Sequence, residues 1–214
     1  MIIIIEPLIN VYKLSLFTVF MGILLDTTVS TKTTLEILKK DPQLYLRGLN
    51  ANYLNLLVIS PIYYILAYNY LLNYNNQIFS ILKYVSLLGI HGIGYYYIHK
   101  QMHINRKLKW IHDFHHEFTI TVPSTGNAVS VFEFQLAYVL PFLVGALLVN
   151  PSTHDFQWSI FTISCFNLII HTKELEYLSY PFFLVSPNDH ITHHKTKSNT
   201  YSAPIINIDN LLRN

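Results

Sequence analysis

Hydrophobic runs long enough to cross a bilayer constrain the fold of this chain more than any other feature. A membrane-spanning helix needs about 20 predominantly apolar residues. Four runs reach or approach this length, at 51–72, 78–98, 129–149 and 157–170, and a further run at 14–25 can span if Val11 and Tyr12 are included. Only 12% of the 214 residues are charged, which is about half the fraction in an ordinary soluble domain. The sequence therefore predicts an all-α integral membrane bundle with four, possibly five, spans.

Lysine and arginine residues are distributed unevenly between these runs. The segments 26–50, 99–128 and 171–214 are basic, whereas the connections 73–77 and 150–156 contain no Lys or Arg. Short loops rich in Lys and Arg stay on the cytosolic side of a membrane, so the three basic segments are predicted to form a cytosolic cap. A soluble helical protein with an apolar core is the alternative. The formal net charge of +2 gives no indication of nucleic-acid binding.

Histidines are concentrated in the segments that are predicted to be cytosolic. They form three boxes, one of pattern H-x-x-x-H and two of pattern H-x-x-H-H. These boxes contain His99 and His103; His112, His115 and His116; and His190, His193 and His194. Residues at i, i+3 and i+4 lie on one helical face, so each box is predicted to direct its imidazoles toward one point.

Eight clustered histidines exceed the needs of one ion, because a structural zinc takes four ligands and a catalytic zinc about three. The boxes therefore predict two metal ions. Imidazole is a good ligand for iron, zinc and copper, and the scarcity of cysteine and acidic residues favours iron or zinc. The single Cys165 excludes a disulfide framework and a cysteine-based metal site.

Other polar residues near the boxes allow two interpretations. Three acidic residues either accept N–H bonds from the metal ligands or are simply solvated; they are Asp113, Glu117 and Asp189. Glu133 lies near a membrane boundary, where the cost of burying a charge favours a functional or paired role. His91 is expected to pack inside a helix. His154 is expected to lie on the side opposite the boxes and not to bind metal.

The boxes and their flanks resemble the fatty acid hydroxylase superfamily of membrane di-iron enzymes, which includes sterol desaturases, sterol methyl oxidases and sphingoid-base and fatty acyl hydroxylases. The resemblance is carried by residues 95–103, 110–118, 188–194 and 199–201, with Asp209. It implies that the eight box histidines are metal ligands. It also implies a ninth ligand, His171, at the end of the last span. Asn167 stands where some relatives have another histidine, and it is expected to bind metal directly or through water.

The resemblance implies a division into membrane helices at 1–89 and a di-metal domain at 90–214, which together form one structural unit. It also implies an O2-dependent oxidoreductase that hydroxylates or desaturates a sterol, sphingoid or fatty acyl lipid. Two iron ions would be the cofactors, replaceable by zinc in recombinant protein, and no catalytic residue is expected beyond their ligands. The sequence has no Gly-rich nucleotide fingerprint, so electrons are expected from a separate donor such as cytochrome b5. In a eukaryote the expected location is the endoplasmic reticulum membrane.

Two departures from the family pattern motivate an alternative function. Gly92 stands where relatives have an acidic residue, and the segment from Ser130 to Glu133 keeps only the glutamate of a usual His-Pro-x-Glu. A membrane protein that binds metal or haem without catalysis is therefore the second hypothesis. A metal-dependent hydrolase with zinc on the same histidines is the third.

Overall fold

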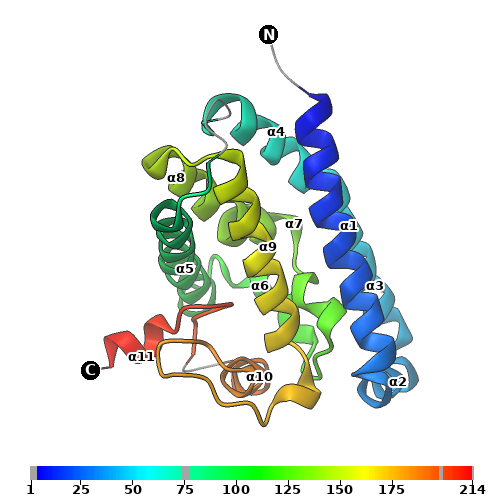
Figure 1. The fold of residues 1–214 in the computed structure, drawn as a ribbon. Coiled ribbons are helices and arrows are strands. Elements are labelled where there is room, and N and C mark those ends of the chain that lie inside the picture. Colours follow the sequence, from blue (N-terminus) through cyan, green and yellow to red (C-terminus); the bar gives the residue numbers. More distant parts are fainter. Residues whose placement is uncertain (1–3, 74–77, 198–199, 214) are drawn as a thin grey trace.

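Long helices that run up and down form the body of the molecule (Figure 1). The computed structural model describes residues 4–73, 78–197 and 200–213. The long elements are α1 (Ile5–Thr28); α3 (Pro42–Tyr53), η1 (Leu54–Ile59) and α4 (Ser60–Tyr70), which run on as one helix; α5 (Ile81–Ile104); α7 (Val131–Glu133), η4 (Phe134–Val139) and α8 (Leu140–Val149), also continuous; and α9 (Thr153–Ile170). Helix α5 packs against α8 and α9, and α1 packs against α4.

Shorter elements gather at one end of these helices, where α2, α10 and α11 are seen in Figure 1. They are α2 (Thr31–Lys40), α6 (Lys109–Asp113), the 3-10 turns η2 (His115–Glu117), η3 (Pro123–Asn127) and η5 (Lys173–Leu175), α10 (Pro187–Thr196) and α11 (Ile208–Leu212). We refer to residues 105–130 and 171–213 as the cap. Isolated bridges are the only β-pairing among the described residues. The prediction of an all-α bundle with a histidine-rich cap is confirmed.

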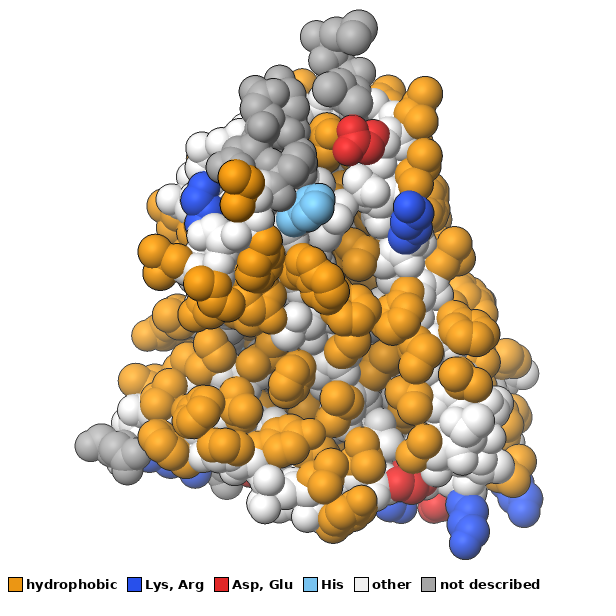
Figure 2. All heavy atoms as spheres, in the orientation of Figure 1, with side chains coloured by type: hydrophobic (Ala, Val, Ile, Leu, Met, Phe, Trp, Pro, Cys, Tyr) orange, Lys and Arg blue, Asp and Glu red, His pale blue; other side chains and the backbone are white. Residues whose placement is uncertain are grey.

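In the part of the chain that the structure describes, three helices are long and apolar enough to cross a membrane, at Ile5–Thr28, Pro42–Tyr70 and Val131–Val149. Figure 2 shows a broad apolar band across the middle of one face, with charged side chains near its two ends. The first span is longer than the predicted run at 14–25. Most of the predicted run at 78–98 lies in the helix α5, and the run at 157–170 lies in α9, but neither helix is as apolar as the other three.

Two of these spans contain a proline that one residue separates from the end of a π-helical segment. Pro61 follows η1 and Pro141 follows η4, and each π-segment begins seven residues before its proline. Proline lacks an N–H group and its ring collides with the carbonyl four residues earlier. The wider π-turn removes this collision, and the residue before each proline bonds to the carbonyl five residues back. Both helices therefore continue through their prolines.

The N-terminal helices are joined to the cap by two carboxylates, those of the buried Asp26 and the half-buried Glu174. Asp26, at the end of α1, accepts a bond from the backbone N–H of Ser124 at 3.0 Å, from the Ser124 hydroxyl, and from the Tyr45 hydroxyl at 2.8 Å. Glu174 in η5 accepts from Ser30, and from Thr33 at 2.5 Å. These contacts fix η3 and η5 beside the histidines. The predicted division at residues 89 and 90 falls within α5 and remains a prediction.

Candidate metal centre

The structure brings all nine predicted histidines together as two groups. Within each group, one ring nitrogen of every residue lies within 4.8 Å of the others. The five-histidine group contains His99, His103, His112, His116 and His193, and the four-histidine group contains His115, His171, His190 and His194. All nine rings are buried except that of His103, which is half-buried. The predicted convergence of the boxes is therefore present in the fold.

Adjacent histidines of one box enter different groups. In the second and third boxes the residues four apart share a group, whereas the residue at i+3 joins the other group. Successive residues of a helix point about 100° apart, so His115 and His116 cannot face the same point, and neither can His193 and His194. The prediction that each box directs its imidazoles to one point is therefore confirmed for the first box and wrong for the second and third. Each H-x-x-H-H box contributes to both groups.

Local sequence sets the start of the helix that carries the third box. Pro187 occupies the first position of α10, where its missing N–H is no loss. The hydroxyl of Ser186 accepts a bond from the Asp189 N–H at 3.2 Å, and the Asp189 carboxylate accepts from the Ser186 N–H, also at 3.2 Å. This capping box fixes the rotation of α10, and with it the direction of its histidines.

The Nε2 atoms of each group point toward its centre. Nε2 of His171 lies 2.9 Å from Nε2 of His190 and 3.3 Å from Nε2 of His194, and the latter two are 3.2 Å apart. In the five-histidine group, Nε2 of His99 lies 2.8 Å from Nε2 of His112. Two nitrogens that each lie about 2.1 Å from one metal ion, at right angles to each other, are about 3 Å apart. The observed separations therefore match those of ligands that share an ion.

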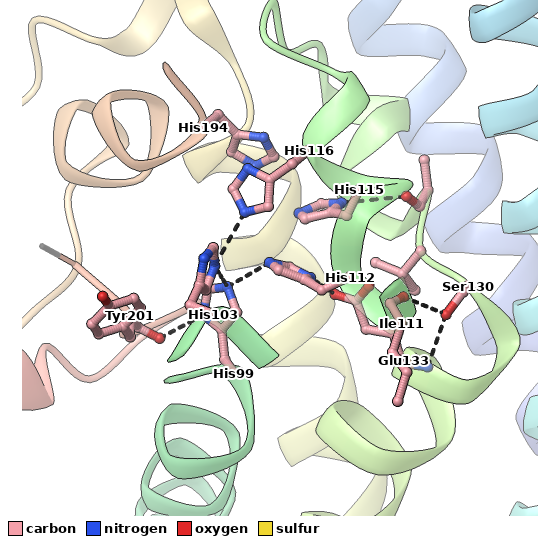
Figure 3. A network of polar contacts seen from close by, with 12 residues as sticks. His99, His103, Ile111, His112, His115, His116, Ser130, Glu133, His194 and Tyr201 are labelled. Atoms are coloured by element: carbon pink, nitrogen blue, oxygen red, sulfur yellow. Dashed lines mark hydrogen bonds and ion pairs between the residues drawn. The ribbon is translucent and has the colours of Figure 1, made fainter. Parts of the chain in front are cut away.

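The outer Nδ1 atoms of five rings donate to oxygen acceptors, and Figure 3 shows several of these bonds. Four acceptors are backbone carbonyls and one is a carboxylate. The pairs are His99 with the Tyr201 carbonyl at 2.7 Å, His112 with Glu133 at 2.6 Å, His115 with the Ala128 carbonyl at 3.3 Å, His171 with the Asn167 carbonyl at 2.7 Å, and His194 with the Phe118 carbonyl at 3.1 Å.

These outer bonds determine which nitrogen carries the proton. A carbonyl accepts and cannot donate, so Nδ1 of the four rings that bond to carbonyls is protonated and Nε2 of each neutral ring carries a lone pair. The same holds for His112 when Glu133 is ionised, because a carboxylate only accepts. His99 and His112 thus face each other with two lone pairs, and so do His171 and His194. Such lone pairs repel unless a cation lies between them. The arrangement is the one that metal-binding histidines show, with the second nitrogen held by an oxygen acceptor.

Burial keeps these imidazoles neutral. Desolvation, followed by the neighbouring histidines, holds the pKa of His190 and of His194 well below the usual range. Desolvation, with His103 next, lowers the pKa of His116 to about 3. A neutral imidazole is the form that binds a metal ion. The chemistry and geometry of this donor set therefore fit two transition-metal ions.

Glu133 is the acidic residue that contacts a histidine. Its side chain is fully buried, one oxygen accepts from His112, and the other has no hydrogen-bond partner among the described residues. Ser130 caps α7 by accepting from the Glu133 N–H at 3.1 Å, and its hydroxyl donates to the Ile111 carbonyl at 2.7 Å (Figure 3). The paired role predicted for Glu133 is confirmed.

The other three acidic candidates do not contact histidines. Glu117 pairs with Arg47 at 2.9 Å on the surface, and Asp113 is exposed. Asp189 accepts from Ser186 in the cap of α10. Asp113 and Glu117 are thus solvated, as one of the two interpretations had it. Asp189 fits neither interpretation, because it is half-buried and caps α10.

Asn167 lies next to the four-histidine group, and its polar atoms bond to neighbouring residues. Its side-chain amide donates to the Asn127 oxygen at 2.9 Å, and its carbonyl accepts from His171. Gly126 permits this close packing, because a Cβ there would lie 3.0 Å from Nδ1 of His171. Its predicted metal ligation stays a prediction.

The two remaining histidines lie outside both groups. His91 is buried in α5 against the Phe142 ring, at 4.4 Å between centroids. His154 is exposed at the start of α9, at the end remote from the cap. Both positions agree with the expectations from sequence.

Several contributors to the site are backbone atoms that sequence patterns do not reveal. The Tyr201 carbonyl is one of them, and Asp209 holds its loop by accepting from the Tyr201 N–H at 2.6 Å and the Ser202 N–H at 2.8 Å. In the sequence, only the resemblance to a known tail motif points to Asp209 and Tyr201. Their physical role is to support His99.

A cavity of about 90 Å³, open on one side, lies between the long helices, and its lining residue Asn167 bonds to His171. Its walls are mostly apolar and aromatic, with Asn127 and Asn167 among the few polar lining residues. The apolar lining residues come from η1 and α4, from η4 and α8, and from α9. An apolar molecule of modest size can be held there.

Residues 84–214 match the family model for fatty acid hydroxylase. A curated relative, the fatty acid hydroxylase ahd1 of Mycosarcoma maydis, is 32% identical over 75 residues. The matched segment covers 35% of this chain and 19% of that protein. No solved structure matches the chain.

Proposed function

Because the chain belongs to the fatty acid hydroxylase family, we propose that it is a membrane-bound oxidoreductase that hydroxylates or desaturates a lipid with O2. Two iron ions, one for each histidine group, are the proposed cofactors. When bound, such ions supply the reduction of O2 and the oxidising power needed to break an unactivated C–H bond. A cofactor carries this chemistry, and the protein supplies position, dryness and access.

One observation carries the proposal. Within each group, neutral imidazoles whose outer nitrogens donate to oxygen acceptors turn their inner lone pairs toward each other at 2.8 to 3.3 Å. A structural histidine cluster without ions would alternate donors and acceptors instead. The four- and five-residue groups each offer enough ligands for one ion, which supports two ions per chain.

The chain's own residues hold and shield this site. Backbone carbonyls and Glu133 fix the ring orientations, and burial of the rings excludes water from the centre. Asn167, with its backbone already engaged by His171, is the proposed tenth ligand, bound directly or through water. The adjacent apolar cavity supports a lipid as the substrate class.

Electrons are proposed to arrive from a separate donor such as cytochrome b5. Exposed cations lie close in sequence to the box histidines, among them Lys107, Lys109 and Lys197. Such a surface attracts an acidic partner and raises its association rate. We further propose that the boxes face the cytosol, since loops rich in Lys and Arg generally stay on the cytosolic side of a membrane, and that a eukaryotic host would place the protein in the endoplasmic reticulum.

Metal analysis combined with O2 uptake tests the proposal. Purified full-length protein, reloaded with Fe(II), should contain two ions per chain and should consume O2 only when both a reductant and a lipid are present. Zinc found before reloading is compatible with the proposal, because histidine sites take the divalent metal that is available. One ion or none in folded protein would overturn it.

The same experiment separates the alternatives. Two ions without O2 uptake under any donor would identify a non-catalytic metal binder. Zinc-dependent cleavage of an ester or amide without O2 uptake would identify a hydrolase. Lipid profiles of cells that express the wild type or His115→Ala would then identify the substrate, as the lipid whose oxidised form appears only with the wild type.

A further inference from the structure

One side of the continuous helix formed by α3 and η1 carries a glycine and two amides. Gly48 and Asn52 are four residues apart and Asn55 follows three residues later, which places them on one side of the helix. All three are buried. They contact a segment that begins at Phe118 and ends at Val129. This side of a candidate membrane span therefore packs against the loop that follows the second histidine box.

Gly48 allows α3 to approach two residues whose carbonyls hold histidines. A Cβ on Gly48 would lie 2.8 Å from the Phe118 ring and 3.3 Å from the Cβ of Ala128. The Phe118 carbonyl accepts from His194, and the Ala128 carbonyl accepts from His115. Both histidines belong to the four-histidine group. A side chain at position 48 would therefore press on both of these supports at once.

Neither contact of Gly48 has free space into which it can move. Phe118 is 1% exposed and Ala128 is fully buried. The Phe118 ring also packs against the Phe114 ring, at 5.7 Å between centroids. Protein interiors are close-packed, so an added methyl group displaces its neighbours and shifts their backbone. The carbonyls of Phe118 and Ala128 would move with that backbone.

The two asparagines hold the same loop through hydrogen bonds. The Asn55 amide nitrogen donates to the Val129 carbonyl at 2.9 Å, and that of Asn52 donates to the Ser124 carbonyl. Neither amide oxygen has a partner among the described residues. Burial of an unpaired amide oxygen is unfavourable, so the bonds to the loop are what these amides contribute. Val129 adjoins Ala128, and the bond from Asn55 fixes the main chain beside one supporting carbonyl.

The supports of the two groups come from different parts of the sequence. Glu133 and the Tyr201 carbonyl hold rings of the five-histidine group, and both lie within residues 84–214, which match the family model. The helix at 42–59 lies outside the matched residues but contacts the loop that supports the four-histidine group.

We propose that Gly48, Asn52 and Asn55 are positioning residues for the four-histidine group; this inference rests on the two-ion centre of the proposed function. They place the carbonyls that orient His115 and His194 without touching either ring. The affinity of this group for its ion therefore depends on how closely the second candidate span packs against the loop.

A chelator competition tests this dependence without turnover. Full-length protein is loaded with Zn(II), and the two ions are titrated against a chelator, with neither O2 nor lipid present. Gly48→Ala should weaken one ion by about tenfold, the lower end of the range for groups that support metal ligands, and should leave the other unchanged. Gly89→Ala is the matched control, because a Cβ at Gly89 meets no atom within 4 Å. Equal weakening of both ions by Gly48→Ala, or of neither, would overturn the proposal.

Ligand variants identify the affected ion. His193→Ala damages the five-histidine group, so its tighter ion belongs to the four-histidine group; in His115→Ala the assignment is reversed. Addition of Gly48→Ala should weaken the tighter ion of His193→Ala and leave the tighter ion of His115→Ala unchanged. The opposite pattern would overturn the proposal.

A second-site change distinguishes positioning from a general loss of stability. Phe118→Leu removes the ring atom that a Cβ at Gly48 would strike. Because residues in contact show coupled effects, Gly48→Ala combined with Phe118→Leu should bind both ions within about threefold of the wild type. A double variant that binds no better than Gly48→Ala alone would overturn the proposed contact.

An amide variant provides an independent measurement if Gly48→Ala does not fold. Asn55→Leu keeps the approximate shape of the side chain and removes its bond to Val129. It should weaken the same ion by about three- to tenfold, the effect of one lost hydrogen bond, whereas Asn50→Leu alters an exposed residue of α3 and should have no effect. Wild-type protein without two ions would count against the proposed function. Wild-type protein with two ions that neither Gly48→Ala nor Asn55→Leu weakens would count against this inference alone.

Discussion

The two histidine groups lie side by side but are supported in different ways. In the four-histidine group, three outer nitrogens donate to backbone carbonyls and every ring is fully buried. In the five-histidine group, His112 relies on the Glu133 carboxylate, His103 is half-buried, and neither ring nitrogen of His193 has a partner among the described residues. The main chain therefore fixes one group, whereas side chains and the C-terminal segment fix the other. The difference predicts that the five-histidine group is the more easily disturbed.

Removal of a ligand should have the largest effect and should not distinguish the groups. His115→Ala removes a ring from the four-histidine group and His193→Ala removes one from the five-histidine group. Each variant should lower lipid oxidation by more than about 100-fold, since even residues that only support metal ligands contribute 10- to 100-fold. Turnover and metal content are measured together, and each variant should retain fewer than two ions.

His154→Ala is the control, because this residue is exposed and outside both groups. Its activity and metal content should equal those of the wild type. An equal loss in all three variants at normal expression would contradict the assignment of the groups.

Substitution of Glu133 should lower the metal affinity of one group and leave that of the other unchanged. Glu133→Gln keeps the shape of the side chain but removes the negative charge that holds His112. Metal affinity of the five-histidine group should fall by about 10- to 100-fold, and the four-histidine group should be unaffected. Competition with a chelator should then show one ion lost early and one retained.

Glu117→Gln is matched to this variant, because Glu117 follows the second box but pairs with Arg47 on the surface. It should release metal as the wild type does. Simultaneous loss of both ions from Glu133→Gln would show that the groups are not independently supported.

A smaller effect is expected from Asp209, which acts on the five-histidine group through the Tyr201 loop. Asp209→Asn weakens the bonds that hold this loop, so the His99 ring loses part of its support. Metal affinity of the five-histidine group should fall by about three- to tenfold, consistent with one weakened hydrogen bond. The chelator assay measures it, with Asp113→Asn as an exposed control. Preferential loss of the ion from the four-histidine group would contradict the proposal that Asp209 supports the five-histidine group through the Tyr201 loop.

The smallest effect concerns electron delivery. Burial, followed by the positive charges of Lys197 and Lys109, lowers the pKa of His103 to about 4. The basic surface therefore lies beside the five-histidine group. Lys107→Glu combined with Lys109→Glu should slow turnover by about threefold at limiting donor and low salt, through weaker steering of an acidic partner. Saturating donor should restore most of the rate. The assay uses detergent, which removes headgroup binding; no salt dependence there would assign these lysines to lipid anchoring.

Much of this architecture is predictable from sequence. Apolar runs identify the long helices, and repeated histidine spacing identifies eight of the nine members of the two groups. The ninth, His171, stands alone in the sequence and is indicated only by the family resemblance. The division of the histidines was not predicted, because spacing alone groups His115 with His116 although their directions differ by about 100°. Backbone acceptors such as the Tyr201 and Phe118 carbonyls leave no mark in a sequence, since every residue has a carbonyl. The helix through Pro61 was predicted, but not the π-turn that allows it.

Helix α10 sends His190 and His194 to one group and His193 to the other. This ten-residue helix therefore supplies ligands to both sites, and each site is complete only when α10 is packed in its place. An ion that binds to one group holds α10 in place and with it a ligand of the other group. We therefore expect the occupancies of the two sites to be thermodynamically linked, so that the loading curve of the protein is steeper than that of two independent sites.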